Sequence, residues 1–208
     1  MFHRKARCHG RSQFQVVSFL EYLSMRKLIA LCALGLVLSG LQPVNAGDLK
    51  SGLQPGEFPK AFYVTDVTGP AASTKLCYRC QYGARPVVSL FVRNMDEKTT
   101  KLIKELDAVV AKNADKKMAA FVTVLTDDPD AQEASLKRIA DEQKIVATPL
   151  AVFENKSGPP TYKIASEAYV TVMMWVDSNV KVNYAFEAGK LTDEMIAKVV
   201  KDTAEILN

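Results

Sequence analysis

The sequence predicts one α/β domain, in which strands and helices alternate along most of the chain. Two apolar runs, residues 87–92 and 118–125, have the length and composition of strands that are buried on both faces. Each run is followed by apolar residues at helical spacing, which predicts the order strand, helix, strand, helix. The composition, 48% hydrophobic and 24% charged, is that of a globular protein.

The N-terminal 46 residues are expected to be a leader that is removed on export. Met25 is followed by Arg26 and Lys27, an apolar run over residues 28–38 and small residues up to Ala46, which is the pattern of a Sec signal peptide. The apolar run has about 11 residues, fewer than the roughly 20 that span a bilayer. We therefore predict a true start at Met25, cleavage after Ala46, no membrane anchor after cleavage, and a secreted or periplasmic protein.

Removal of this leader changes the net charge of the chain and the number of its histidines and cysteines. The whole chain has 27 Lys and Arg against 23 Asp and Glu, whereas residues 47–208 keep 21 against 22. A net charge near −1 gives no electrostatic support for a nucleic-acid or anionic-membrane partner. Both histidines leave with the leader, which excludes histidine bases and histidine metal sites from the mature chain. Of four cysteines, only Cys77 and Cys80 remain.

The mature chain begins with a predicted flexible lead-in, residues 47–60, because glycine, proline and polar residues dominate it. The predicted domain covers residues 61–208. A strand at 62–67 ends in the turn Thr68-Gly69-Pro70, and a short extended piece at Lys75-Leu76 leads to the cysteines. Pro86 then precedes the apolar strand 87–92, where it can stand because the first residue of a strand need not donate to the ladder.

The elements after this strand are placed by caps and periodicity. Asn94, followed three residues later by Glu97, predicts the start of a helix over residues 95–112. Pro129 fits the first turn of the next helix, and Thr192 caps the last one. The other predicted elements are the strand 149–154, the turn 156–160, an irregular or helical stretch at 162–168, and a hairpin of strands 170–176 and 180–186 around residues 177–179.

This order of elements resembles a known family. The resemblance rests on residues 62–67 with the Gly69-Pro70 turn, residues 86–92, 136–145, 148–153 and 161–164, the hairpin from Val172, and the last helix. Over roughly residues 60–207 the chain is similar to the thioredoxin-like superfamily, and most to its redoxin and peroxiredoxin branch. The resemblance implies a three-layer α/β/α fold with a central mixed sheet.

The chain departs from that family where its reactive cysteine would stand. In the family this cysteine follows the first central strand and begins the next helix, where backbone N–H groups lower its pKa. Here the position holds Asn94-Met95-Asp96-Glu97, and the loop Tyr169-Val170-Thr171 lacks the family's cis-proline. A plain thioredoxin alignment would make Thr148-Pro149 that cis-proline, but it leaves residues 165–186 unexplained. We therefore expect the redoxin arrangement.

Cys77 and Cys80, separated by two residues, have the spacing of thiol-disulfide exchange. By analogy Cys77 is the expected nucleophile and Cys80 the resolving cysteine. Arg79 is expected to favour the thiolate, and Tyr78 to offer an apolar surface to a client protein that carries a thiol or a disulfide. Two other interpretations stay open: a structural disulfide before the strand, and half of a zinc site completed by other ligands.

Two further clusters have structural interpretations, and no cofactor is expected. Asp127-Asp128-Pro129-Asp130 is typical of a helix start, and Met173-Met174-Trp175 of a buried strand. The sequence thus predicts an exported thioredoxin-like protein with redox activity through Cys77 and Cys80. The alternative is a non-catalytic redoxin-fold protein that binds or scaffolds and in which this disulfide is structural. The oligomeric state is not predicted.

Overall fold

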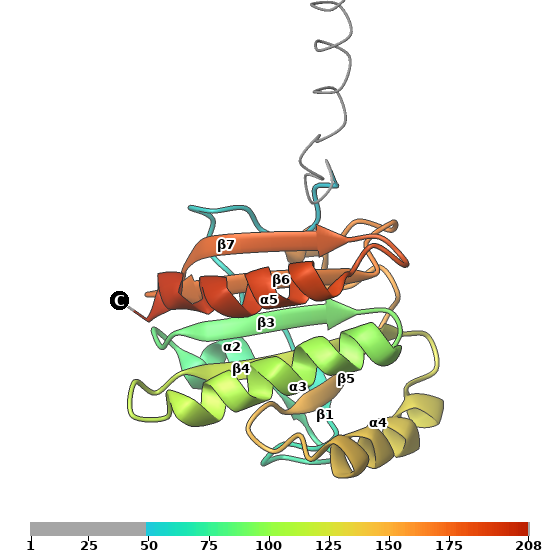
Figure 1. Cartoon of the computed structure of the whole chain (residues 1–208). Coiled ribbons are helices and arrows are strands. Elements are labelled where there is room, and N and C mark those ends of the chain that lie inside the picture. Colours follow the sequence, from blue (N-terminus) through green and yellow to red (C-terminus); the bar gives the residue numbers. More distant parts are fainter. Residues whose placement is uncertain (1–48, 208) are drawn as a thin grey trace, which may run out of the picture. The chain divides into compact units, whose positions relative to one another are not determined.

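The structure, a computed structural model, describes residues 49–207 (Figure 1). The predicted leader and its cleavage site lie outside the described residues, as do Cys8 and Cys32. No helix within residues 49–207 has the length and apolar character needed to cross a membrane.

Seven strands form one mixed sheet in the order β2-β1-β5-β4-β3-β6-β7. The central strand β3 pairs in parallel with β4 and antiparallel with β6. Every residue of β3 and β4 is buried, as their apolar runs predicted. The strands are β1 (Val64–Asp66), β2 (Lys75–Leu76), β3 (Val87–Val92), β4 (Ala119–Thr126), β5 (Leu150–Glu154), β6 (Val170–Val176) and β7 (Asn179–Phe186).

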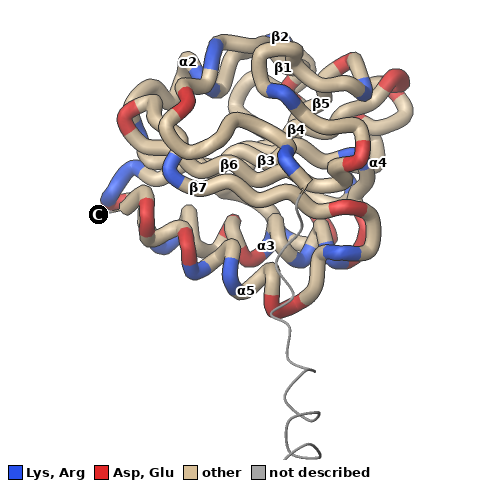
Figure 2. Tube along the Cα trace, turned by 90° about the horizontal axis from the view of Figure 1, so that it is seen from above, with Lys and Arg blue, Asp and Glu red and all other residues tan. Residues whose placement is uncertain are grey.

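The sheet separates two layers of cover, which confirms the predicted α/β/α arrangement. On one face, α3 (Glu97–Lys112), α4 (Pro129–Gln143) and α5 (Asp193–Asp202) pack their apolar stripes against the strands (Figures 1 and 2). On the other face lie α2 (Tyr78–Tyr82), the short helix η1 (Pro160–Tyr162) and the segment before β1. A second short helix, η2 (Thr203–Ile206), continues α5.

Caps set the ends of these helices. Asp96 accepts a hydrogen bond from the Thr99 N–H, at 2.8 Å, so α3 begins at Glu97 and the predicted cap Asn94 is wrong by two residues. Asp128 caps α4 and Thr192 caps α5, as predicted. The hairpin between β6 and β7 turns on Asp177 and Ser178, both with positive φ, which is the geometry of a tight two-residue turn.

The segment before β1 lacks regular secondary structure, as predicted, but it is not a free arm. Ser51 is buried and its hydroxyl lies 2.7 Å from that of Thr171 in β6. The Asn183 side chain donates to the Ser51 and Leu53 carbonyls, both at 2.9 Å. The packed unit therefore starts near Ser51 rather than at residue 61, because these long-range contacts fix a polar stretch that looks like a linker.

The sheet order decides between the two alignments. The strand after Pro149 is β5, which pairs with β4, whereas the antiparallel neighbour of β3 is β6. In addition, residues 49–207 contain no cis peptide bond, so Thr148-Pro149 is not a cis-proline. The plain thioredoxin alignment is therefore excluded, and the redoxin arrangement holds.

Candidate functional site

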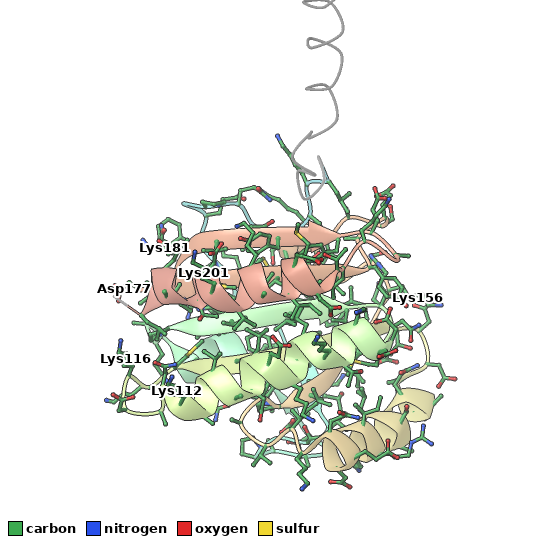
Figure 3. All side chains as sticks on the ribbon, in the orientation of Figure 1. Lys112, Lys116, Lys156, Asp177, Lys181 and Lys201 are labelled. Carbon is green, nitrogen blue, oxygen red and sulfur yellow. A yellow bond between two sulfur atoms is a disulfide. The ribbon has the colours of Figure 1, made fainter. Side chains whose placement is uncertain are left out.

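Cys77 and Cys80 form a disulfide around the first turn of α2 (Figure 3). Cys77 is the N-cap of this helix, and its sulfur accepts a hydrogen bond from the Cys80 N–H at 3.1 Å. The two cysteines differ in access to solvent: Cys77 is 7% exposed, whereas Cys80 is classed as exposed. Cys80 is therefore the half of this disulfide that is more open to solvent.

Tyr78, which lies between the cysteines, is buried rather than presented to a partner. Its hydroxyl donates to the Asp66 carboxylate at 2.8 Å, and its ring stacks on Tyr82 and Phe121 with centroids 5.5 and 5.2 Å apart. Burial, followed by the hydrogen bond to Asp66, raises the pKa of Tyr78. Tyr78 thus fixes α2 to the sheet.

Asp66 ties the same cluster to the turn after β1. Its two carboxylate oxygens accept the N–H groups of Gly69 and Ala71, at 2.9 and 2.8 Å, in addition to the Tyr78 hydroxyl. Three donors therefore satisfy a carboxylate that is fully buried, which is the condition for burying such a group.

Arg79 also anchors α2. Its guanidinium donates to the Pro59 carbonyl at 3.0 Å and to the Ser178 hydroxyl at 2.7 Å. These bonds join the helix to the segment before β1 and to the β6–β7 turn. All the hydrogen bonds of this guanidinium therefore go to oxygen atoms. That Arg79 favours the thiolate form of the cysteines stays a prediction.

Tyr82 and Arg85 hold the end of α2 and the loop that follows it. The Arg85 guanidinium lies 5.1 Å from the centre of the Tyr82 ring, and its Nε donates to the Lys117 carbonyl at 2.7 Å. Burial, partly offset by Arg85, raises the pKa of Tyr82 to about 12. The loop after α2 is therefore held against the α3–β4 loop, and the disulfide sits on a fixed support.

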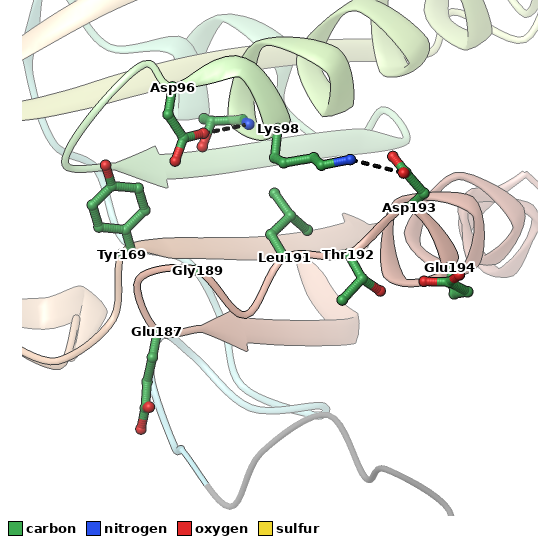
Figure 4. Close-up of a pocket in the computed structure, with 10 residues that line it drawn as sticks. Asp96, Lys98, Tyr169, Glu187, Gly189, Leu191, Thr192, Asp193 and Glu194 are labelled. Atoms are coloured by element: carbon green, nitrogen blue, oxygen red, sulfur yellow. Dashed lines mark hydrogen bonds and ion pairs between the residues drawn. The ribbon is translucent and has the colours of Figure 1, made fainter.

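The opposite end of β3, where the family would place its reactive cysteine, holds charged side chains instead. A cavity of about 280 Å³ lies there, between the starts of α3 and α5 (Figure 4). Asp193 of α5 pairs with Lys98 at 2.7 Å and with Lys101 at 2.9 Å, and these two lysines lower the pKa of Asp193 to about 2. Tyr169 occupies the position of the missing proline and its carbonyl accepts the Arg93 N–H. The site contains no sulfur nucleophile.

The remaining predicted clusters are structural. Asp128 accepts the Ala131 N–H at 3.2 Å as the cap of α4, and Asp127 pairs with Lys156 at 3.0 Å. Met173, Met174 and Trp175 are fully buried in β6. Within residues 49–207, no group of three or more histidine, cysteine or carboxylate side chains is placed to hold a metal ion, so a zinc site at Cys77 and Cys80 has no further ligands there.

Sequence reasoning missed α2 and the surface beside it. A helix of five residues is too short to show helical periodicity, and cysteine is not among the usual N-caps. It also missed that Phe58 and Tyr63 stay exposed, by 58% and 64%, close in sequence to the buried Phe62. For Tyr63, the strand expected over residues 62–67 was the available sign, because neighbouring side chains of a strand point to opposite faces.

No protein-family model and no curated protein matches this sequence. Solved structures do. One is a provisionally named protein disulfide isomerase from Bacteroides thetaiotaomicron, with TM-score 0.58 and 14% identity, covering 76% of this chain and 94% of that one. The thioredoxin domain of a thiol-disulfide oxidoreductase from Bacteroides vulgatus has TM-score 0.54 and 12% identity, with coverages of 75% and 99%.

A third similar structure comes from the other branch of the same fold. AhpC from Mycobacterium tuberculosis has TM-score 0.56 and 11% identity, covering 75% of this chain and 99% of that one. At these identities the likeness concerns the fold, and it agrees with the sheet order described above. The chain is therefore a protein of the thioredoxin-like fold, with its Cys77–Cys80 disulfide displaced to the helix before the central strand.

Proposed function

We propose that this protein is an exported thiol-disulfide exchange protein that acts through Cys77 and Cys80. The observation that carries the proposal is the asymmetry of the disulfide, whose Cys80 side is exposed while Cys77 is buried. A bond of this kind can be attacked from solvent, and the thiol that leaves stays inside the protein, ready to re-form the bond. This is what a reversible exchange centre needs.

A purely structural role is a weaker explanation of this disulfide. The loop between Cys77 and Cys80 is so small that closing it removes only about 2 kcal/mol of unfolded-state entropy in the chain-entropy model. In addition, α2 is already fixed by the Tyr78 bond to Asp66 and by the Arg79 bonds to Pro59 and Ser178. The helix does not depend on the disulfide for its position.

Exposure favours Cys80, rather than Cys77, as the sulfur that exchanges. A client thiolate attacks the Cys80 sulfur, a client–Cys80 disulfide forms, the Cys77–Cys80 bond breaks, and Cys77 leaves as a thiolate that the Cys80 N–H can stabilise. A second client thiolate then attacks the client sulfur and releases Cys80, so the client is oxidised and the protein reduced. Another disulfide, such as oxidised glutathione, restores the starting state.

Export is supported by the sequence of the leader and by the disulfide itself, since such bonds persist in oxidising compartments. Expression of the full chain, followed by fractionation and N-terminal sequencing, tests this part. The expected mature N-terminus is Gly47, and an unprocessed cytoplasmic chain would contradict export.

The competing function is a non-catalytic module, and one observation favours it: the usual catalytic position, Asn94 to Glu97, has no thiol. The reduction potential separates the two. We would titrate the full chain with glutathione redox buffers and follow the mass shift of alkylated thiols, with Cys8 and Cys32 replaced by serine. A potential between about −120 and −270 mV, the range of exchange proteins, supports our proposal. A value below about −300 mV would make the disulfide a structural bond and overturn it.

A further inference from the structure

Two exposed aromatic rings lie in the segment directly before β1. Among residues 49–207, the large hydrophobic side chains that are strongly exposed are Phe58 (58%), Tyr63 (64%) and Val146 (86%). Two of these three belong to the chain that runs past α2. Exposed aromatic rings are typical of surfaces that bind a partner.

Phe58 lines a groove on this surface. The groove has a volume of about 490 Å³ and is lined by Leu53, Phe58, Lys60, Thr161 and Lys163 together with the Gly56-Glu57 backbone. We call it the Phe58 groove. Leu53 and Phe58 supply apolar lining, and Lys60 and Lys163 supply charged lining. A single apolar side chain with polar neighbours matches this mixture.

The backbone around Phe58 is fixed on both sides, so its ring is held out rather than loosely placed. The Gly56 N–H donates to the Val180 carbonyl at 2.9 Å, and the Val180 N–H donates to the Glu57 carbonyl at 3.0 Å. On the other side, the Tyr162 hydroxyl donates to the Lys60 carbonyl at 2.7 Å. A preformed site of this kind loses little entropy on binding.

The groove is connected directly to the redox helix. Arg79, between the two cysteines, donates to the carbonyl of Pro59, which separates Phe58 from Lys60. On the other side of the disulfide, the antiparallel register pairs Val64 with Leu76, so Tyr63 and Cys77 are the next residues of the two strands. The Pro59 carbonyl thus links the groove to the helix that carries the disulfide, and Tyr63 and Cys77 lie at the ends of two paired strands.

The segment before β1 and strand β2 each carry an exposed lysine. Lys60 and Lys75 are both exposed, and neither forms a salt bridge within the part of the chain that the structure describes. Lys163, by contrast, pairs with Glu57, and this pair is close to neutral. A partner that brings carboxylates to Lys60 and Lys75 is therefore favoured over one that brings cations, by an attraction that salt screens.

Building on the proposed function, we infer that the client of Cys80 is an unfolded polypeptide that carries an apolar side chain and acidic residues near its cysteine. The apolar side chain occupies the Phe58 groove, the carboxylates lie against Lys60 and Lys75, and the client cysteine then reaches Cys80. The exchange step is the one described above, with glutathione disulfide or another disulfide as the oxidant that restores the protein.

Three thiols test this inference in the full chain with Cys8 and Cys32 replaced by serine. They are 2-mercaptoethanol and two cysteine octapeptides with one leucine and two charged residues, either glutamates or lysines, at least three positions from the cysteine. The rate of Cys77–Cys80 reduction is compared per thiolate. We expect the acidic peptide to react about tenfold faster than the basic one at low salt, and this ratio to shrink at high salt.

Two variants locate the effect. Phe58→Ala is expected to lower the rate of disulfide reduction by the acidic peptide about tenfold, because one half-buried aromatic contact is lost. The rate with 2-mercaptoethanol is expected to stay the same. Val146→Ala is the matched control, because Val146 is exposed and lies at the opposite layer near Asp107. Lys60→Glu is expected to reverse the preference between the peptides. All of these positions are exposed, so folding is preserved.

The outcomes separate the inference from the function on which it rests. Equal rates for both peptides, or a Phe58→Ala rate equal to that of Val146→Ala, would overturn the inference while 2-mercaptoethanol still reports exchange. No reduction by any of the three thiols would overturn the proposed function and the inference with it.

Discussion

The helices at the two ends of β3 differ in the chemistry of their N-caps. At its N-terminal end, α2 presents a disulfide whose one cysteine is exposed. At its C-terminal end, where the resemblance places the family's thiol, Asp96 caps α3 and Asp193 pairs with two lysines. Both ends belong to one thioredoxin-like fold, but within the described residues only the N-terminal end of β3 carries cysteine, which illustrates that function belongs to sites rather than to folds.

The difference has a physical basis in how each end satisfies its polar groups. At the C-terminal end, the Asp96 carboxylate accepts the Thr99 N–H of the first turn of α3, which is where a cysteine thiolate would otherwise be stabilised. At the N-terminal end, the Cys77 sulfur itself accepts the cap hydrogen bond, from the Cys80 N–H. One end uses a carboxylate as its cap and the other uses sulfur.

The largest expected effect comes from removing the ring that fixes α2. Tyr78 is 1% exposed, so Tyr78→Ala leaves a cavity and removes one of the three donors to the buried Asp66 carboxylate, and we expect the free energy of unfolding to fall by about 3–5 kcal/mol. Urea denaturation measures this. Tyr63→Ala, at an exposed tyrosine one strand away, should change stability by less than about 0.5 kcal/mol; comparable losses in both variants would contradict the anchoring role of Tyr78.

A smaller effect is expected when the anchor between the cysteines is removed. Arg79→Ala loses the bonds to Pro59 and Ser178 and should cost about 1–2 kcal/mol, because the guanidinium is partly exposed. The same variant tests whether Arg79 acts on the thiolate. If Arg79 is only an anchor, Arg79→Ala leaves the pH dependence of alkylation of the reduced protein unchanged. If Arg79 stabilises the thiolate, Arg79→Ala raises the thiol pKa and Arg79→Lys restores it.

At the C-terminal end of β3, loss of the cap should affect stability alone. Asp96→Ala leaves the Thr99 N–H without its acceptor and is expected to cost about 1 kcal/mol. The reduction potential of Cys77–Cys80 should not change. Asp96→Asn, which keeps an acceptor, is the matched control. A changed potential in Asp96→Ala would show that the two ends of β3 are coupled and would break the comparison.

The smallest expected effect concerns acid. Lys98 and Lys101 lower the pKa of Asp193 to about 2, below its ordinary value near 3.9 in an unfolded chain. The stability from these ion pairs is therefore complete above about pH 4 and is lost as the pH falls through about 2. Carboxyl NMR titration of Asp193 tests the pKa, and Asp193→Asn should abolish this part of the acid dependence. An Asp193 that titrates near 4 would show that the ion pairs do not form in solution.

Much of the fold could be predicted because its strands are buried on both faces and therefore apolar without interruption. Residues 87–92 are an example. Pro129 and Thr192 marked helix starts because first-turn prolines and N-caps act on their own helix and can be recognised locally. The packing of Ser51 against Thr171 could not be predicted, because it depends on residues 120 positions apart. The same holds for Arg79, whose acceptors lie before β1 and in the hairpin turn.

The two cysteines of the disulfide were predicted from the sequence, but its geometry was not. The spacing of Cys77 and Cys80 indicated a disulfide, and the missing thiol at Asn94 to Glu97 was readable directly from the sequence. Which sulfur faces solvent was not, because it depends on α2 turning Cys77 inward as its cap. Burial of Tyr78 likewise follows from a partner, Asp66, that no local pattern connects to it.

The most direct test of the account identifies the sulfur that exchanges. The full chain, with Cys8 and Cys32 replaced by serine, is treated with glutathione, quenched with acid and mapped by mass spectrometry. Parallel samples carry Cys77→Ser or Cys80→Ser and are treated with oxidised glutathione. We predict glutathione on Cys80 in the parent chain, and faster labelling of Cys77→Ser than of Cys80→Ser. Adducts on Cys77 alone, or no adduct while the fold stays intact, would contradict an exchange centre at the N-terminal end of β3.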